Sequence, residues 1–259
     1  MTTTTQTVDR TDLEAKVKEV YQQVAQDPFG EFHFAMGRSL AEQLGYSPAD
    51  LDRIPPQAVD SFAGVGFHFD LAAIALAESV LDLGSGSGMD SFIAAVKTGE
   101  KGRVHGLDMT DAQREKAESL AVAAGFEQVT YHKGYIEQIP FPDGSFDVVI
   151  SNGVINLSAD KPSVFREAAR VLKPGGRFAL SDIVTEKPLP GSVSCNASLW
   201  AACIGGALQQ DDYFVDIRNA GLRIEMVRDN SQYVFLSDNA RSAALKYGVK
   251  SVSLVAVKT

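Results

Sequence analysis

Cysteine is scarce in this sequence, with only two among 259 residues. So few cysteines exclude a disulfide framework and suit a reducing compartment, so we expect a cytoplasmic protein. No apolar run approaches the ~20 residues that a membrane-spanning helix needs. Residues 1–10 are rich in Thr and lack the apolar segment of a secretory signal, and we interpret them as a disordered tail.

Positive charge is also in short supply. The chain has 24 Lys and Arg against 33 Asp and Glu, a net charge of −9 and no basic run. Because binding to a phosphate backbone needs concentrated Lys and Arg, nucleic acid is excluded as the substrate. We predict no metal site and find no internal repeat. The apolar fraction of 45% is that of an ordinary globular protein.

The most informative segment is an apolar run, 80–83, that passes directly into three alternating glycines, Gly84, Gly86 and Gly88. A helical pattern follows, and then a second apolar strand ends at Asp108. Glycines allow positive φ angles and the close approach of a ligand to the backbone. A carboxylate such as Asp108 offers acceptors to two vicinal hydroxyls. The pattern therefore predicts a nucleoside-binding site.

The spacing of the glycines differs from that of a dinucleotide-binding turn. The fingerprint Gly-x-Gly-x-x-Gly places a pyrophosphate at a helix N-terminus. Here Gly88 comes one position early, and Met89 stands where the third glycine is needed. Asp82, beside the turn, would repel a pyrophosphate but suits a ligand that carries an ammonium and a sulfonium. A nicotinamide-dependent oxidoreductase is therefore disfavoured.

Strand and helix patterns alternate from Ser79 onward, which predicts an α/β fold with a mainly parallel sheet covered on both faces. The expected strands are 79–83, 103–107, 128–132, 146–151, 177–182, 223–228, 232–236 and 250–257. The expected helices are 13–25, 34–44, 48–51, 89–98, 111–124 and 161–171, with two more helical patterns in 187–222. Segment 54–70 is expected to be irregular. Ligands bind beyond the carboxyl ends of such strands, where Asp82, Asp108 and Asn152 fall.

Several segments match one known family. They read Leu-Asp-Leu-Gly-Ser-Gly-Ser-Gly-Met-Asp at 81–90, Gly-Leu-Asp-Met-Thr at 106–110, Ser-Asn-Gly-Val-Ile-Asn-Leu at 151–157 and Cys-Ile-Gly-Gly-Ala at 203–207. The sequence thereby resembles the arsenite methyltransferase branch of the class I S-adenosylmethionine (SAM) methyltransferases. The resemblance implies a Rossmann-like, seven-stranded sheet with an antiparallel last strand. It also implies a helical cap at 11–78, and a SAM-binding domain at 79–259 with a substrate-side insertion at 187–222.

The same resemblance implies SAM as methyl donor, S-adenosylhomocysteine (SAH) as product and a set of donor-binding residues. That set is Asp82, Gly84, Ser85, Gly86, Gly88, Asp108, Met109, Ile136 and Asn152. We expect Asp108 to hold the ribose hydroxyls, Met109 to pack on the adenine and Ile136 to offer its backbone N–H. Asp90 is expected to stabilise the first helical turn rather than contact the ligand.

Two family positions that carry cysteine in the arsenic-methylating members differ in this chain. They are occupied by Val65 and Gly153, and only Cys203 remains. Soft metalloids need several converging thiolates. If one helix joins Cys195 to Cys203, the two residues are ~12 Å apart along its axis, which is too far for their thiols to hold one atom. We therefore predict methyl transfer to another small-molecule acceptor. Arsenite methylation and a catalytically silent SAM-binding protein are the alternatives.

The catalytic residue is left open by the motifs, because an O or N acceptor uses a general base whereas a thiol or enolate acceptor needs none. The candidates are Tyr21, His33, His68 and Cys203. Both histidines lie among phenylalanines and also fit a structural role, and Cys203 also fits a buried apolar position. Trp200 is expected either to wall the acceptor pocket or to pack between helices.

Overall fold

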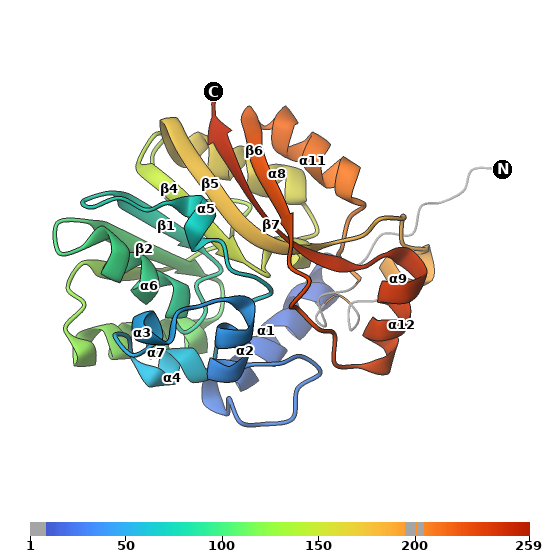
Figure 1. The fold of residues 1–259 in the computed structure, drawn as a ribbon, viewed down its shortest axis with the longest axis horizontal. Helices are drawn as coiled ribbons and strands as arrows, with labels where there is room; N and C mark the ends of the chain where they lie inside the picture. Colours follow the sequence, from blue (N-terminus) through green and yellow to red (C-terminus); the bar gives the residue numbers. More distant parts are fainter. Residues whose placement is uncertain (1–8, 195–199, 201–204) are drawn as a thin grey trace.

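A seven-stranded sheet forms the centre of the protein in the computed structural model, which describes residues 9–194, 200 and 205–259 (Figure 1). The strand order is β3-β2-β1-β4-β5-β7-β6. Strand bounds are β1 Ser79–Leu83, β2 Arg103–Asp108, β3 Val129–Lys133, β4 Phe146–Asn152, β5 Leu172–Val184, β6 Leu222–Asp229 and β7 Lys250–Lys258. Only β7 runs antiparallel to its neighbours, β5 and β6. The predicted sheet, with its antiparallel last strand, is confirmed.

Helices cover both faces of this sheet. Their bounds are α1 Arg10–Gln26, α2 Gly37–Leu44, α3 Pro48–Leu51, α4 Pro56–Asp60, α5 Phe69–Ala72, α6 Met89–Thr98, α7 Asp111–Ala124, α8 Lys161–Val171, α9 Gly191–Ser194, α11 Gln210–Asn219 and α12 Asp238–Tyr247, with a short 3₁₀ turn η1 at Ile155–Leu157. Because strand side chains alternate, Val80 belongs to the buried cluster that includes residues of α6 and α7, whereas Leu81 belongs to the one that includes residues of α8 and α11. Among the described residues, no helix has the length and apolar character to cross a membrane.

Some predicted elements at the N-terminal end have different bounds. Asp9 caps α1, and its carboxylate accepts hydrogen bonds from the N–H groups of Thr11 and Asp12. The helix therefore begins inside the predicted tail 1–10, and residues 1–8 lie outside the described part of the chain. The expected helix 34–44 begins only at Gly37, and segment 54–70 contains α4 and the start of α5 rather than irregular chain throughout.

The predicted strand 232–236 is wrong. Both sides of β7 are already taken by β5 and β6, and the segment instead leads into α12, a helix that was not predicted. The apolar residues in this segment make aromatic contacts, since the rings of Tyr233 and Phe235 meet edge to face at 5.2 Å. The strand expected at 177–182 is longer than predicted, because β5 runs from Leu172 to Val184.

Two hydrogen bonds fix α1 against α7. Gln113 Nε2 donates to the carbonyl oxygen of Tyr21 at 2.9 Å, and Lys116 Nζ donates to that of Ala25 at 2.9 Å. Leu13 and Val17, on the inner side of α1, are buried. The cap helix is thereby positioned over the carboxyl ends of the central strands.

Candidate functional site

A cavity of about 410 Å³ lies between α1, the glycine turn and the carboxyl ends of β1, β2 and β4. Eight of the nine predicted donor-binding residues line it. They are Asp82, Gly84, Ser85, Gly86, Asp108, Met109, Ile136 and Asn152. The ninth, Gly88, does not line the cavity. It is the N-cap of α6 and has the left-handed conformation, with φ of 93°. The topology therefore gathers at one place residues that are up to 70 positions apart in the sequence (Asp82 to Asn152).

The glycine turn is held by β2. The N–H groups of Gly84 and Ser85 donate to the carbonyl oxygen of Leu107 at 2.8 and 3.1 Å. Gly84 and Gly86 have φ of 69° and 53°. A Cβ on Gly86 would have its nearest neighbour, Gln113 Oε1, at 3.8 Å, so this part of the turn borders open space. A ligand can therefore approach the backbone of the turn directly.

The Asp108 carboxylate has the free acceptor positions that a diol needs. Its Oδ2 accepts from the N–H of Gly86 at 2.9 Å, and its Oδ1 accepts from the N–H of Thr110 at 2.8 Å. Each oxygen keeps a second lone pair, which suits two vicinal hydroxyls. Burial raises the pKa of Asp108, and the two backbone donors oppose that rise. Ser85 also lines the cavity, and its buried Oγ has no partner among the described residues. These residues fit the nucleoside part of SAM.

A buried polar network joins the donor turn to β4. Asp82 accepts from Ser91 Oγ at 2.7 Å. Asp90 accepts from the hydroxyl of Tyr46 at 2.6 Å and from Asn152 Nδ2 at 3.0 Å. Burial raises the pKa of Asp82 well above its ordinary value and that of Asp90 to about 6. Asp90 also lines the cavity, so its role is wider than the expected support of the helix start.

The two positions that differ from the arsenic-methylating pattern lie side by side. A Cβ built on Gly153 would lie 3.3 Å from Val65 Cγ1. Asn152 Oδ1 accepts from the N–H of Val65 at 2.8 Å, which fixes this loop at the tip of β4. Gly153 lines the cavity, whereas Val65 is buried behind it, so neither position presents a thiol. Cys195 and Cys203 lie outside the described residues.

The catalytic candidates are dispersed. Tyr21 lines the cavity from α1, whereas His33 and His68 are not among its lining residues. His68 is fully buried, and its ring stacks on Phe69 with 4.9 Å between centroids. Trp200 does not line the cavity either, since its Nε1 donates to Ser194 O at 2.7 Å and its ring lies 4.6 Å from Lys161 Nζ. The packing role of Trp200 fits these contacts.

The buried His68 provides a test of stability. Burial lowers its pKa to about 3, and Nε2 has no partner among the described residues. Because the imidazole titrates near 6.5 in the unfolded chain, stability is lost as pH falls below that value. By pH 5 the loss from this one group is about 2 kcal/mol. We expect His68→Leu to remove that part of the acid sensitivity, measured as urea unfolding free energy at pH 7 and pH 5. Parallel pH dependences of variant and wild type would contradict this.

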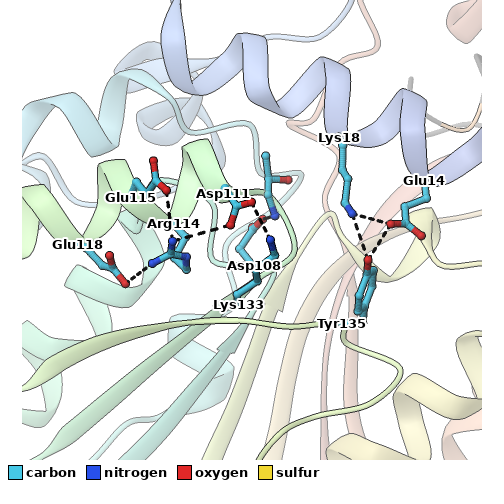
Figure 2. A network of polar contacts seen from close by, with 10 residues as sticks. Glu14, Lys18, Asp108, Asp111, Arg114, Glu115, Glu118, Lys133 and Tyr135 are labelled. Atoms are coloured by element: carbon cyan, nitrogen blue, oxygen red, sulfur yellow. Dashed lines mark hydrogen bonds and ion pairs between the residues drawn. The ribbon is translucent and has the colours of Figure 1, made fainter.

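A cluster at the cavity mouth was not predicted. Figure 2 shows the Tyr135 hydroxyl between Glu14 and Lys18 of α1; it donates to Glu14 Oε1 at 2.7 Å and accepts from Lys18 Nζ at 3.1 Å. The hydrogen bond from Lys18, and then that from Tyr135, lowers the pKa of Glu14. Glu14 and Tyr135 both line the cavity. The helical stripe of α1 marks its apolar face, but no local pattern links residues 121 positions apart.

Comparisons with known proteins agree with this geometry. A family model described as a methyltransferase domain matches residues 76–221. An arsenite methyltransferase from Halobacterium salinarum is 39% identical over 201 residues, which are 77% of this chain and 51% of that protein. The arsenite methyltransferase of Homo sapiens is 45% identical over 138 residues, which are 50% of this chain and 37% of that protein. The chain spans about half the length of the curated relatives it matches.

Solved structures give the same result. An arsenic(III) SAM methyltransferase from Chlamydomonas reinhardtii superimposes with a TM-score of 0.63 at 33% identity, over 86% of this chain and 74% of that one. A geranyl diphosphate C-methyltransferase from Streptomyces coelicolor reaches a TM-score of 0.69 at 17% identity, over 95% and 98%, which shows a shared fold. The chain therefore belongs to the class I SAM-dependent methyltransferases, in their arsenite methyltransferase-like branch.

Proposed function

We propose that this protein transfers a methyl group from SAM to a small organic acceptor. The observation that carries the proposal is one cavity that gathers the predicted donor residues and has further lining. The glycine turn, Asp82 and Asp108 line it, and so do Gly64, Gly153 and the apolar side chains of α1. A donor and an acceptor bound in this cavity would meet in a shared space. The scarcity of cysteine supports a cytoplasmic location.

On the donor side the residues have separate tasks. Asp108 binds the ribose hydroxyls, the backbone of Gly86 allows close approach, and Met109 packs on the adenine. Bound SAM supplies an electrophilic methyl group, whose bond to sulfur breaks with the electron pair remaining on sulfur as the acceptor forms its bond to carbon. The polypeptide contributes geometry and a dry environment.

On the acceptor side the main task is positioning. Holding a nucleophile close and collinear can contribute roughly 7–11 kcal/mol to the lowering of a barrier. Leu13 and Val17 of α1 and Phe62 line the cavity with apolar surface, and Tyr21 adds a ring that carries a hydroxyl. These side chains exclude water and favour an apolar or mixed acceptor. Its position in the lining supports Tyr21 as the candidate that exchanges a proton with the acceptor.

Arsenite is the second candidate acceptor, because arsenite methyltransferases are among the relatives. Against it, the adjacent positions Val65 and Gly153 supply no thiolate, and soft metalloids are held by converging thiolates. A methyl-transfer assay decides between the two acceptor classes. We expect radiolabel from SAM to appear on members of a panel of phenols, amines and organic thiols, and not on arsenite supplied with glutathione. Efficient labelling of arsenite would overturn the organic-acceptor proposal.

Introducing thiols at positions 65 and 153 provides a second test of the same interpretation. We expect the double variant Val65→Cys, Gly153→Cys, kept reduced, to bind phenylarsine oxide at least tenfold more tightly than the wild type. The expectation rests on the 3.3 Å separation of a Gly153 Cβ from Val65 Cγ1. The matched control is Val65→Ser, Gly153→Ser, which carries the same backbone strain at position 153 (φ of 72°) without thiols. Equal binding by both double variants would show that these positions do not form a metalloid site.

A further inference from the structure

Three carboxylates face one cavity without a cationic partner. Asp82, Asp90 and Asp108 all line it, and the hydrogen bonds that they accept come from neutral donors. Among the described residues that line the cavity, Arg10 is the one basic side chain. Buried charges are ordinarily paired, so this arrangement suits a ligand that brings positive charge. Ser85 lines the same cavity, and its buried Oγ has no partner among the described residues.

The orientation of Asp90 is fixed by its neighbours. Asn152 Oδ1 accepts from the N–H groups of Val65 and Gly66, at 2.8 and 3.3 Å, so its amide nitrogen must point to Asp90. The ring of Tyr46 is held edge to face against Phe62 at 5.2 Å. The amide and the hydroxyl hold the Asp90 carboxylate in place, and neither of them neutralises its charge.

We propose that Asp90 is a specificity residue that, with Asp82, makes the cavity favour the cationic methyl donor over the neutral-sulfur product. This inference rests on the proposed function. Transfer of the methyl group leaves the bonding electron pair on sulfur and converts a sulfonium into an uncharged thioether. The attraction to Asp90 is therefore present before transfer and lost afterwards. Asp90 thus promotes exchange of product for fresh donor.

The proposal predicts a pH dependence with a definite sign. The groups that face Asp90 are the hydroxyl of Tyr46, the amide of Asn152 and the carboxyl of Asp82. Asp108 and Tyr131 act on Asp82 in turn. The pKa of Asp90 is raised to about 6 by burial, so its charge is present above that pH and lost below it. The preference for SAM over SAH should therefore also be present above that pH and decline below it.

The test is calorimetric titration of the full chain with SAM and, separately, with SAH. We expect Asp90→Asn to weaken SAM roughly tenfold at pH 7.5 and to change SAH affinity less than threefold. Asparagine keeps the shape and can keep hydrogen bonds to Tyr46 and Asn152. The matched control is Asp238→Asn, which removes one negative charge from a carboxylate on α12 whose side chain is 93% exposed. It should leave both affinities unchanged.

The wild-type protein provides a second measurement that needs no variant. Its preference for SAM over SAH should fall about tenfold between pH 7.5 and pH 5. At pH 5.5, titrations in buffers of different ionisation enthalpy should show more protons released by SAM than by SAH. The proposal would be overturned if the preference for SAM over SAH were independent of pH, or if Asp90→Asn weakened the binding of SAM and SAH equally. Failure of the wild type to bind either ligand would instead overturn the proposed function.

Discussion

Asp108→Ala is expected to reduce the affinity for SAH at least about 100-fold. In the proposed donor site the variant would lose two hydrogen bonds between a charged carboxylate and the ribose hydroxyls, each of which contributes about 1.5–3 kcal/mol. It also removes the acceptors for the N–H groups of Gly86 and Thr110, so the turn itself loses support. Calorimetric titration of SAH into wild type and variant measures the effect.

Asp111→Ala is the matched control for this substitution. Asp111 is three residues further on, at the start of α7, where it pairs with Lys133 at 2.7 Å on the surface (Figure 2). Its loss should leave SAH affinity within threefold of the wild type. Asp108→Asn serves as a second variant that retains the volume of the side chain. SAH affinity within threefold of wild type in Asp108→Ala, with the fold intact, would contradict the assignment of the ribose site.

Gly88→Ala is expected to destabilise the protein by about 2–5 kcal/mol. Gly88 has φ of 93°, where an L-residue is strained by roughly 1–2 kcal/mol. The added Cβ would also overlap the hydroxyl oxygen of Tyr131 and lie 3.0 Å from Phe92 Cε2, and overpacking costs about 1–3 kcal/mol more. Both rings are buried, so they have little room to move. Urea unfolding with an unchanged slope gives the difference in stability.

Gly125→Ala separates the two causes of this loss. Gly125 ends α7 with φ of 72°, and a Cβ there would have no neighbour within 4 Å. It should therefore show only the backbone strain, roughly 1–2 kcal/mol. If Gly88→Ala and Gly125→Ala lose the same stability, the close approach of Tyr131 to the turn has no energetic consequence.

Local signals account for the part of the fold that could be predicted. Helices α6, α7 and α8 have the predicted bounds, because each start and stop is marked nearby. Gly88 and Gly99 flank α6, Gly125 ends α7, and the Asp160 side chain caps α8 by accepting from Ser163 N. The gathering of eight of the nine proposed donor residues around one cavity was predictable too, since parallel strands bring their carboxyl ends together.

Contacts between distant segments account for what was missed. Asp90 has an ordinary first-turn position in the sequence, and its link to Tyr46, 44 residues earlier, depends on how the cap packs. The same holds for Glu14 and Tyr135 at the cavity mouth. The segment 232–236 has a strand-like composition, but the order of the sheet leaves β7 no free edge for it. Propensity is overridden by tertiary context in such places.

Calorimetric titration of SAH into the wild-type protein, with and without arsenite, tests the central claim most directly. We predict binding with a micromolar or lower dissociation constant that arsenite leaves unchanged, because the glycine turn, Asp82 and Asp108 line one cavity and Val65 and Gly153 supply no thiolates. Absence of SAH binding would contradict the donor site, and binding that is strengthened by arsenite would contradict the organic acceptor.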